Sequence, residues 1–266
     1  MTTIRAYPLE SILVGVTTLL TMAGFWNIYA GPASEANAYH HLHLATTLVW
    51  LLLLGVQLAL AGNRNYASHR RTGLAVLVVA PLLVASATLL SVESARKGLA
   101  SGQGDMMVVQ NVMATLELAL IIILAFVLRR RRALHASFLM STALLFLGIA
   151  TFFTLIGFVP GFRIEGPETF HRFGKALVTV QYTSLAIGAL LFAKAPRDGW
   201  PFLLVGAFAL INGFLTSALT KAGLVQPLTE VVGSAHQTLA FVASFATVLV
   251  LLVATGLPAA AVRRTA

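Results

Sequence analysis

Cysteine is absent from the 266-residue chain. This absence excludes disulfides, zinc–thiolate sites, iron–sulfur clusters and thiol nucleophiles, so any metal or cofactor must be held by histidine, methionine or oxygen ligands. The chain also lacks a Walker phosphate-binding loop, a dinucleotide-binding glycine fingerprint and a serine-hydrolase nucleophile elbow. Nucleotide-driven pumps and hydrolases are therefore disfavoured.

Charged residues are scarce. They make up 10% of the chain against 58% apolar residues, whereas an average soluble domain has roughly 25% charged residues. The mean hydropathy is +0.87, and the apolar runs are continuous rather than alternating, which favours helices over a barrel. Because about twenty apolar residues in a helix cross a bilayer, the composition predicts a multi-pass membrane protein and excludes a soluble globule.

Breaks at charged, proline and glycine residues divide the chain into eight predicted spans. Their ranges are 11–30, 43–62, 73–92, 106–128, 134–159, 171–193, 200–220 and 234–257. We therefore predict an all-α transmembrane bundle that forms a single integral membrane domain, 1–266. Similar stretches near the ends of the third and seventh spans suggest a four-plus-four parallel repeat, with halves 1–132 and 133–266.

The formal net charge of +9 is distributed unevenly. In the eight-span arrangement, basic residues gather on the side of the N-terminus, including the run Arg129–Arg132, which is typical of a lipid-headgroup anchor. The positive-inside rule then places both termini in the cytoplasm and the protein in a bacterial inner membrane. The basic balance indicates the lipid bilayer as partner, with no nucleic acid.

Histidines lie at or near the ends of the predicted spans. On the outer side, the second, sixth and eighth spans present imidazoles at similar depth, which predicts a copper or zinc site. The residues are His43, His171 and His236, with His40 as an alternate ligand. A simpler interpretation is that each imidazole anchors a helix end among the lipid headgroups.

A second pair of histidines lies on the cytoplasmic side. His69 begins the predicted third span and His135 the fifth. Two such side chains can ligate a haem b iron axially, and the neighbouring Arg70 and Arg71 can bind the haem propionates. Headgroup anchoring is the alternative here too.

Glu117 is the acidic residue predicted inside a span, near the middle of the fourth. An ionised carboxylate at that depth costs about 2.5–3.5 kcal/mol on insertion scales. Glu117 is therefore predicted to be a proton relay, a cofactor counter-ion or part of a transport path, together with Gln57 and Gln181 on polar helix faces. The alternative is a neutral acid bonded to a neighbour such as Gln57, Gln181 or Asn212.

The order of these features carries two resemblances. His40 and His43 with Trp50 and Gln57, then His69-Arg-Arg-x-Gly73, then Arg-Ala-Leu-His135, resembles an uncharacterised family of bacterial inner-membrane proteins over roughly residues 39–150. The placement of histidines near opposite faces is similar to cytochrome b561-type di-haem proteins. That likeness implies electron transfer across the membrane, although cytochrome b561 proteins pair histidines on adjacent helices in a more compact bundle.

Three functions follow as hypotheses. The first is a membrane redox or metal protein, an oxidoreductase or its electron-transfer component, that works with a redox partner in the membrane. The second is a transporter or lipophilic-ligand binder that uses Glu117, Gln57 and Gln181. The third is a non-catalytic subunit of a membrane complex.

Overall fold

A computed structural model describes residues 7–31, 34, 36–102 and 105–256, and within them every regular element is helical. Eight helices are long and apolar enough to cross a membrane. They are α2 (Pro8–Ala30), α3 (Ala38–Gly62), α5 (Val76–Ala100), α6 (Val108–Val127), α7 (Arg132–Phe158), α8 (Arg172–Lys194), α9 (Trp200–Lys221) and α11 (Gln237–Gly256). The predicted all-α bundle of eight spans is confirmed.

Two short helices were not predicted. α4 (Tyr66–Gly73) follows α3, and α10 (Val225–Ser234) precedes α11. His69 therefore lies in α4, whose start is capped by the Asn65 side chain, and does not begin the third span. The hydropathy pattern misses both helices because neither is long enough to cross a bilayer.

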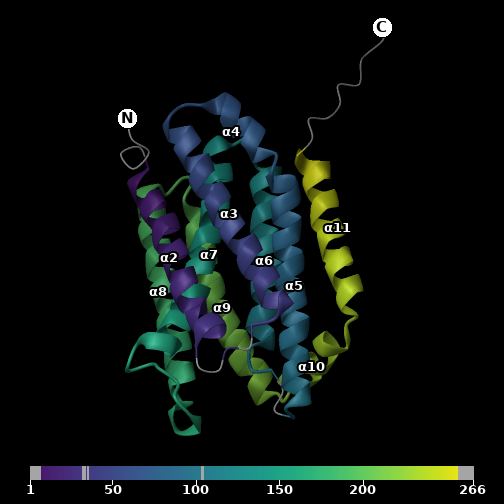
Figure 1. Ribbon diagram of the computed structural model, residues 1–266. Coiled ribbons are helices and arrows are strands. Elements are labelled where there is room, and N and C mark those ends of the chain that lie inside the picture. Colours follow the sequence, from purple (N-terminus) through teal and green to yellow (C-terminus); the bar gives the residue numbers. More distant parts are fainter. Residues whose placement is uncertain (1–6, 32–33, 35, 103–104, 257–266) are drawn as a thin grey trace.

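The spanning helices run side by side and alternate in direction (Figure 1). α2 begins and α11 ends at the same end of the bundle, which is named here the N-terminal end; the opposite end, where α10 lies, is the far end. The four-plus-four repeat and the halves 1–132 and 133–266 stay predictions. α2 packs on α7 and α11 packs on α5, so each proposed half contacts the other.

Close packing holds the helices together toward the N-terminal end of the bundle. Trp50 of α3 is completely buried, and its indole N–H donates to the Thr142 hydroxyl of α7 at 2.9 Å. The hydroxyl of Thr17 in α2 donates to the Ala143 carbonyl of α7 at 3.1 Å. Such interhelical hydrogen bonds and small-residue contacts are what bind helices together in lipid, where the hydrophobic effect gives no preference for helix over acyl chain.

Glycines allow α8 and α9 to approach closely. A Cβ atom on Gly188 would lie 2.5 Å from the Phe202 carbonyl oxygen, and one on Gly206 would lie 2.9 Å from the Leu185 Cα. Any larger residue would push the two helices apart. This tight pair forms one wall of the cavity described below.

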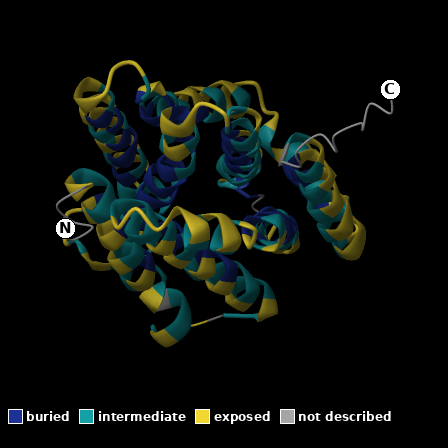
Figure 2. Cartoon of the chain, turned by 90° about the horizontal axis from the view of Figure 1, so that it is seen from above, coloured by how far each residue is buried: buried dark blue, intermediate teal, exposed yellow. Residues whose placement is uncertain are grey.

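α11 stands at the edge of the bundle. It packs against α5 and α6, and seen from above it lies apart from the cluster of the other spans (Figure 2). The buried residues of the other helices face inward (Figure 2). Large apolar side chains such as Leu52 and Phe214 are exposed. An apolar exterior of this kind matches a lipid environment.

Candidate functional site

A cavity of about 390 Å³ lies inside the bundle. We call it the central chamber. It is bordered by α2, α3, α5, α6, α7, α8 and α9, and its lining includes Lys97 and Met107 at the far end and Asn212 and Val205 deeper in the bundle. Leu118 and Leu144 line the chamber and also belong to the packed core. The chamber therefore extends from the far end to about the middle of the bundle and stops at that core.

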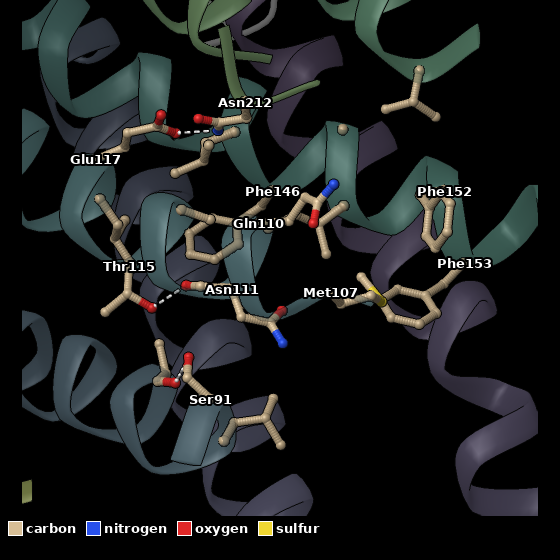
Figure 3. A pocket seen from close by; sticks show the side chains of 18 of the residues that line it. Ser91, Met107, Gln110, Asn111, Thr115, Glu117, Phe146, Phe152, Phe153 and Asn212 are labelled. Carbon is tan, nitrogen blue, oxygen red and sulfur yellow. Dashed lines mark hydrogen bonds between the residues drawn. The ribbon is translucent and has the colours of Figure 1, made fainter. Parts of the chain in front are cut away.

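Glu117 and Asn212 face each other across the inner part of the chamber. The Asn212 amide N–H donates to the Glu117 carboxylate at 3.2 Å, and only 3% of Glu117 and 8% of Asn212 are exposed. Figure 3 shows this bonded pair at one end of the chamber, while Met107, Phe152 and Phe153 gather at the other. The hydrogen bond belongs to the alternative interpretation of Glu117, and of the three partners named for it the structure shows Asn212.

Three polar atoms in the chamber have no hydrogen-bond partner within the described residues. They are Glu117 Oε1, Asn212 Oδ1 and Gln110 Oε1, and each is inaccessible to solvent. Gln110 lies on the same face of α6 as Glu117, about two helical turns nearer the far end. Because an unsatisfied buried acceptor costs about 1–3 kcal/mol, this concentration of unpartnered acceptors in one cavity indicates a place where something binds.

Gln181 of α8 also lines the chamber and is buried. Its amide packs directly over Gly213 of α9, and a Cβ atom at that position would displace the amide. Gln181 therefore lies in the same cavity as Glu117, as the transport-path hypothesis supposed. The glycine of α9 is what makes room for it.

A cluster of polar side chains lies at the far end of the chamber, which we call its mouth. The Glu93 carboxylate of α5 accepts from the Asn37 amide at 3.1 Å and from the Gln237 amide at 3.2 Å, which ties α5 to the starts of α3 and α11. Tyr39 adds a hydrogen bond to Gln237 at 3.0 Å. Glu93, His40 and Lys97 line this part of the chamber.

The structure separates the histidines predicted to hold copper or zinc. Within the described chain, no group of three or more His, Asp or Glu side chains could hold a metal ion. His43 lines the chamber and hydrogen-bonds with the Ser86 hydroxyl at 3.2 Å. His171 and His236 are exposed, and each makes a hydrogen bond to backbone next to its own helix start. The interfacial-anchor interpretation accounts for His171 and His236.

The second pair of histidines lies at the N-terminal end, close enough for the charge of one ring to affect the other. Burial of His69, together with the nearby charge of His135, lowers the pKa of His69 below its usual 6.5. His135 Nδ1 lies 2.8 Å from the Ala125 carbonyl oxygen, and its ring packs edge-on against Phe126. Arg70 and Arg71 follow His69 in α4, as the haem hypothesis requires.

Gln57 lies in this second region and not among the residues that line the chamber. With both ends of its amide satisfied, Gln57 accepts from the Gly73 backbone N–H at 3.0 Å and from the Thr72 hydroxyl at 2.7 Å. Its NH₂ group then lies 3.0 Å from His69 Nε2. Gln57 thus fixes the end of α4 and the orientation of the His69 ring.

Comparison with known proteins gives no relative: no family model, no curated protein and no solved structure matches the chain. The assignment is therefore to a multi-pass helical membrane protein and to no named family.

Proposed function

We propose that the protein binds a small lipophilic molecule in the central chamber, as a step in transporting it across the membrane. The observation that carries the proposal is the buried Glu117–Asn212 pair with unpartnered oxygen atoms at the inner end of an otherwise mostly apolar cavity. Ligand sites combine such a cavity, in the range of about 300–1,000 Å³, with a few placed polar groups. A carboxyl group at membrane depth is energetically costly, and its presence there therefore indicates a function.

The shape of the chamber supports transport rather than a passive void. It is lined to the far end by Lys97 and Met107 and is closed toward the N-terminal end by the packed core around Trp50. A site near the membrane midplane that is reached from one face only corresponds to one of the two states of an alternating-access cycle.

The charges at the helix ends indicate the side of the membrane on which the chamber opens. At the N-terminal end lie Arg64, Arg70, Arg71, Arg129–Arg132, Lys194 and Arg197, opposed by Glu10 and Asp198. By the positive-inside rule, this excess of basic residues supports a cytoplasmic location for this end, in a bacterial inner membrane. Arg5, Arg263 and Arg264, which entered the same argument, lie outside the described residues. The chamber then opens on the side of the membrane away from the cytoplasm.

Filling the chamber tests this function. Ala114 of α6 lines the cavity, so Ala114→Phe is expected to occupy the space of a ligand. At least one of 4-phenylbutylamine, 4-phenylbutan-1-ol and 4-phenylbutanoate should raise the unfolding temperature of the wild-type protein in detergent. The reason is that a ligand at 100 times its Kd stabilises the folded state by about 2.7 kcal/mol. Ala114→Phe should remove that shift.

Leu120→Phe is the matched control, because Leu120 lies on the same helix, is exposed and does not line the chamber. This variant should respond to the probes as the wild type does. If none of the three compounds stabilises the wild type, or if folded Ala114→Phe responds unchanged, the chamber is not a binding site.

Electron transfer through haem b is the second candidate, and the proximity of His69 to His135 favours it. The Arg70 and Arg71 side chains of α4 are available to bind propionates, and a redox partner in the membrane would be needed. An absorption spectrum of the purified protein, oxidised and then reduced with dithionite, tests this candidate. A Soret band that shifts on reduction and is lost in His69→Ala and His135→Ala would establish it.

A further inference from the structure

The unpartnered polar atoms of the chamber share one chemical property. Glu117 Oε1, Asn212 Oδ1 and Gln110 Oε1 are all oxygen acceptors. One of the two N–H donors of the Asn212 amide is used, because it donates to Glu117. The buried chamber atoms that lack a partner are therefore all acceptors, and a group that completes them must donate.

The charges that line the chamber point the same way. Glu117 lies at the inner end and Glu93 at the mouth, while Lys97 lines the mouth and is engaged in an interaction of its own. His43 pairs with Ser86, and His40 pairs with Asn37 at the start of α3. Among the residues that the structure describes, no arginine lines the chamber. The innermost charged group is thus a carboxyl that has no basic side chain as a hydrogen-bond or ion-pair partner within the described chain.

From this arrangement we propose that the ligand of the chamber is an amine that binds as its ammonium ion between Glu117 and Asn212. An ammonium group brings up to three N–H donors and one positive charge. When the two buried side chains rotate toward the cavity, it supplies a donor to Glu117 Oε1 and another to Asn212 Oδ1, and it neutralises the carboxylate. This inference rests on the proposed function, since it specifies the class of molecule that occupies the same site.

The lining of the rest of the chamber indicates the chemistry of the remainder of the ligand. Beyond the Glu117–Asn212 pair the lining is mostly apolar, and Met107, Phe152 and Phe153 form its far part (Figure 3). An apolar or aromatic body attached to the amine by a short chain fits such a lining. The class is a small lipophilic amine, and a carboxylate or phosphate of the same size is excluded by repulsion from Glu117.

A matched pair of probes tests the head group. 4-Phenylbutylamine and 4-phenylbutan-1-ol share the same apolar body and differ in the terminal group. Binding of each to the detergent-purified full chain at pH 7 is measured by calorimetry. The wild type is expected to bind the amine about tenfold more tightly than the alcohol, because a hydrogen bond to a charged partner is the stronger one.

Glu117→Gln then separates charge from shape. The variant keeps the length of the side chain and an acceptor oxygen but has no negative charge, so its affinity for the amine should fall about tenfold while its affinity for the alcohol stays within about threefold. Glu230→Gln is the control, because Glu230 is exposed, hydrogen-bonds to Gln226 and does not line the chamber. It should bind both probes as the wild type does.

The outcomes are distinct. A preference for the amine that disappears in Glu117→Gln supports the proposal. Equal binding of amine and alcohol by the wild type overturns the ammonium inference but leaves the lipophilic-ligand site intact. If the wild type binds neither probe, the inference fails, and the proposed function fails with it when 4-phenylbutanoate does not bind either. The comparison of the two probes on the wild type decides the inference even if Glu117→Gln does not fold.

Discussion

Glu117→Met is expected to weaken binding of 4-phenylbutylamine about a hundredfold while leaving the protein folded. Removing one partner of a buried, hydrogen-bonded charge pair costs about 2–5 kcal/mol, and each 1.4 kcal/mol is a factor of about ten. Met has nearly the volume of Glu, so the chamber wall keeps its shape. Titration of the amine by calorimetry, wild type against variant, measures the loss.

The free energy of unfolding is expected to rise when Glu117 and Asn212 are both replaced, although ligand binding is lost. In Glu117→Met the Asn212 N–H group loses its acceptor, which offsets the gain from removing the carboxyl group. Glu117→Met combined with Asn212→Leu removes the polar pair together with both of its unpartnered oxygens. An unsatisfied buried polar group costs about 1–3 kcal/mol.

The double variant is therefore expected to unfold at a higher temperature than the wild type and to bind no amine. Such an exchange of stability for function is typical of binding sites. A double variant that still binds the amine, or one that is clearly less stable than the wild type, would show that the pair is a structural element of the bundle.

Trp50→Ala is expected to have the largest effect on stability, a loss of about 3–5 kcal/mol in the free energy of unfolding. The indole of α3 is fully buried, and the substitution leaves a void and removes the hydrogen bond to the Thr142 hydroxyl of α7, which keeps its bond to the Leu139 carbonyl. The stability that is lost comes from van der Waals packing and not from the hydrophobic effect, because lipid is as apolar as the protein interior. Thermal unfolding in detergent, followed by the near-ultraviolet circular dichroism, measures it.

Trp26→Ala provides the comparison for this prediction. Trp26 is 59% exposed on α2, so its removal should change the free energy of unfolding by no more than about 0.5 kcal/mol. Equal losses in the two variants would mean that the packed core around Trp50, which closes the chamber toward the N-terminal end, is not as the structure describes it.

The spans were predictable from sequence, and the site only in part. A run of some twenty apolar residues predicts a membrane-spanning helix, such as α5 or α7, without any knowledge of the helices that pack against it. Glu117 could be singled out as well, since a carboxyl group in such a run is costly wherever it points. Its partner Asn212 was one of three alternatives, because the choice depends on which helices are adjacent and not on the sequence of either.

The features that the sequence did not reveal depend on packing. His171 and His236 match His43 in their position along the helices, yet helix rotation and the exposed edge position of α11 leave them apart. The Glu93 cluster with Asn37 and Gln237 joins three distant segments and has no spacing signature. The polar spacing of Gln110, Asn111 and Glu117 along α6 was the available signal for the chamber, and its empty volume appears only when the helices are assembled.

The central claim is that a chamber opens to one face of the membrane and reaches past Ala114. Because the chain has no cysteine, Ala114→Cys introduces a single thiol into α6, and its reaction with a membrane-impermeant methanethiosulfonate requires water and a thiolate at that point. The reagent is applied to intact cells stripped of their outer membrane and to inverted membrane vesicles, with lipid-facing Leu120→Cys as the control.

The expected result is modification of Ala114→Cys from the outer side, slowed by 4-phenylbutylamine, with no reaction from the cytoplasmic side and none at Leu120→Cys. A thiol at position 114 that is unreactive from both sides, or that reacts only from the cytoplasmic side, would contradict the account.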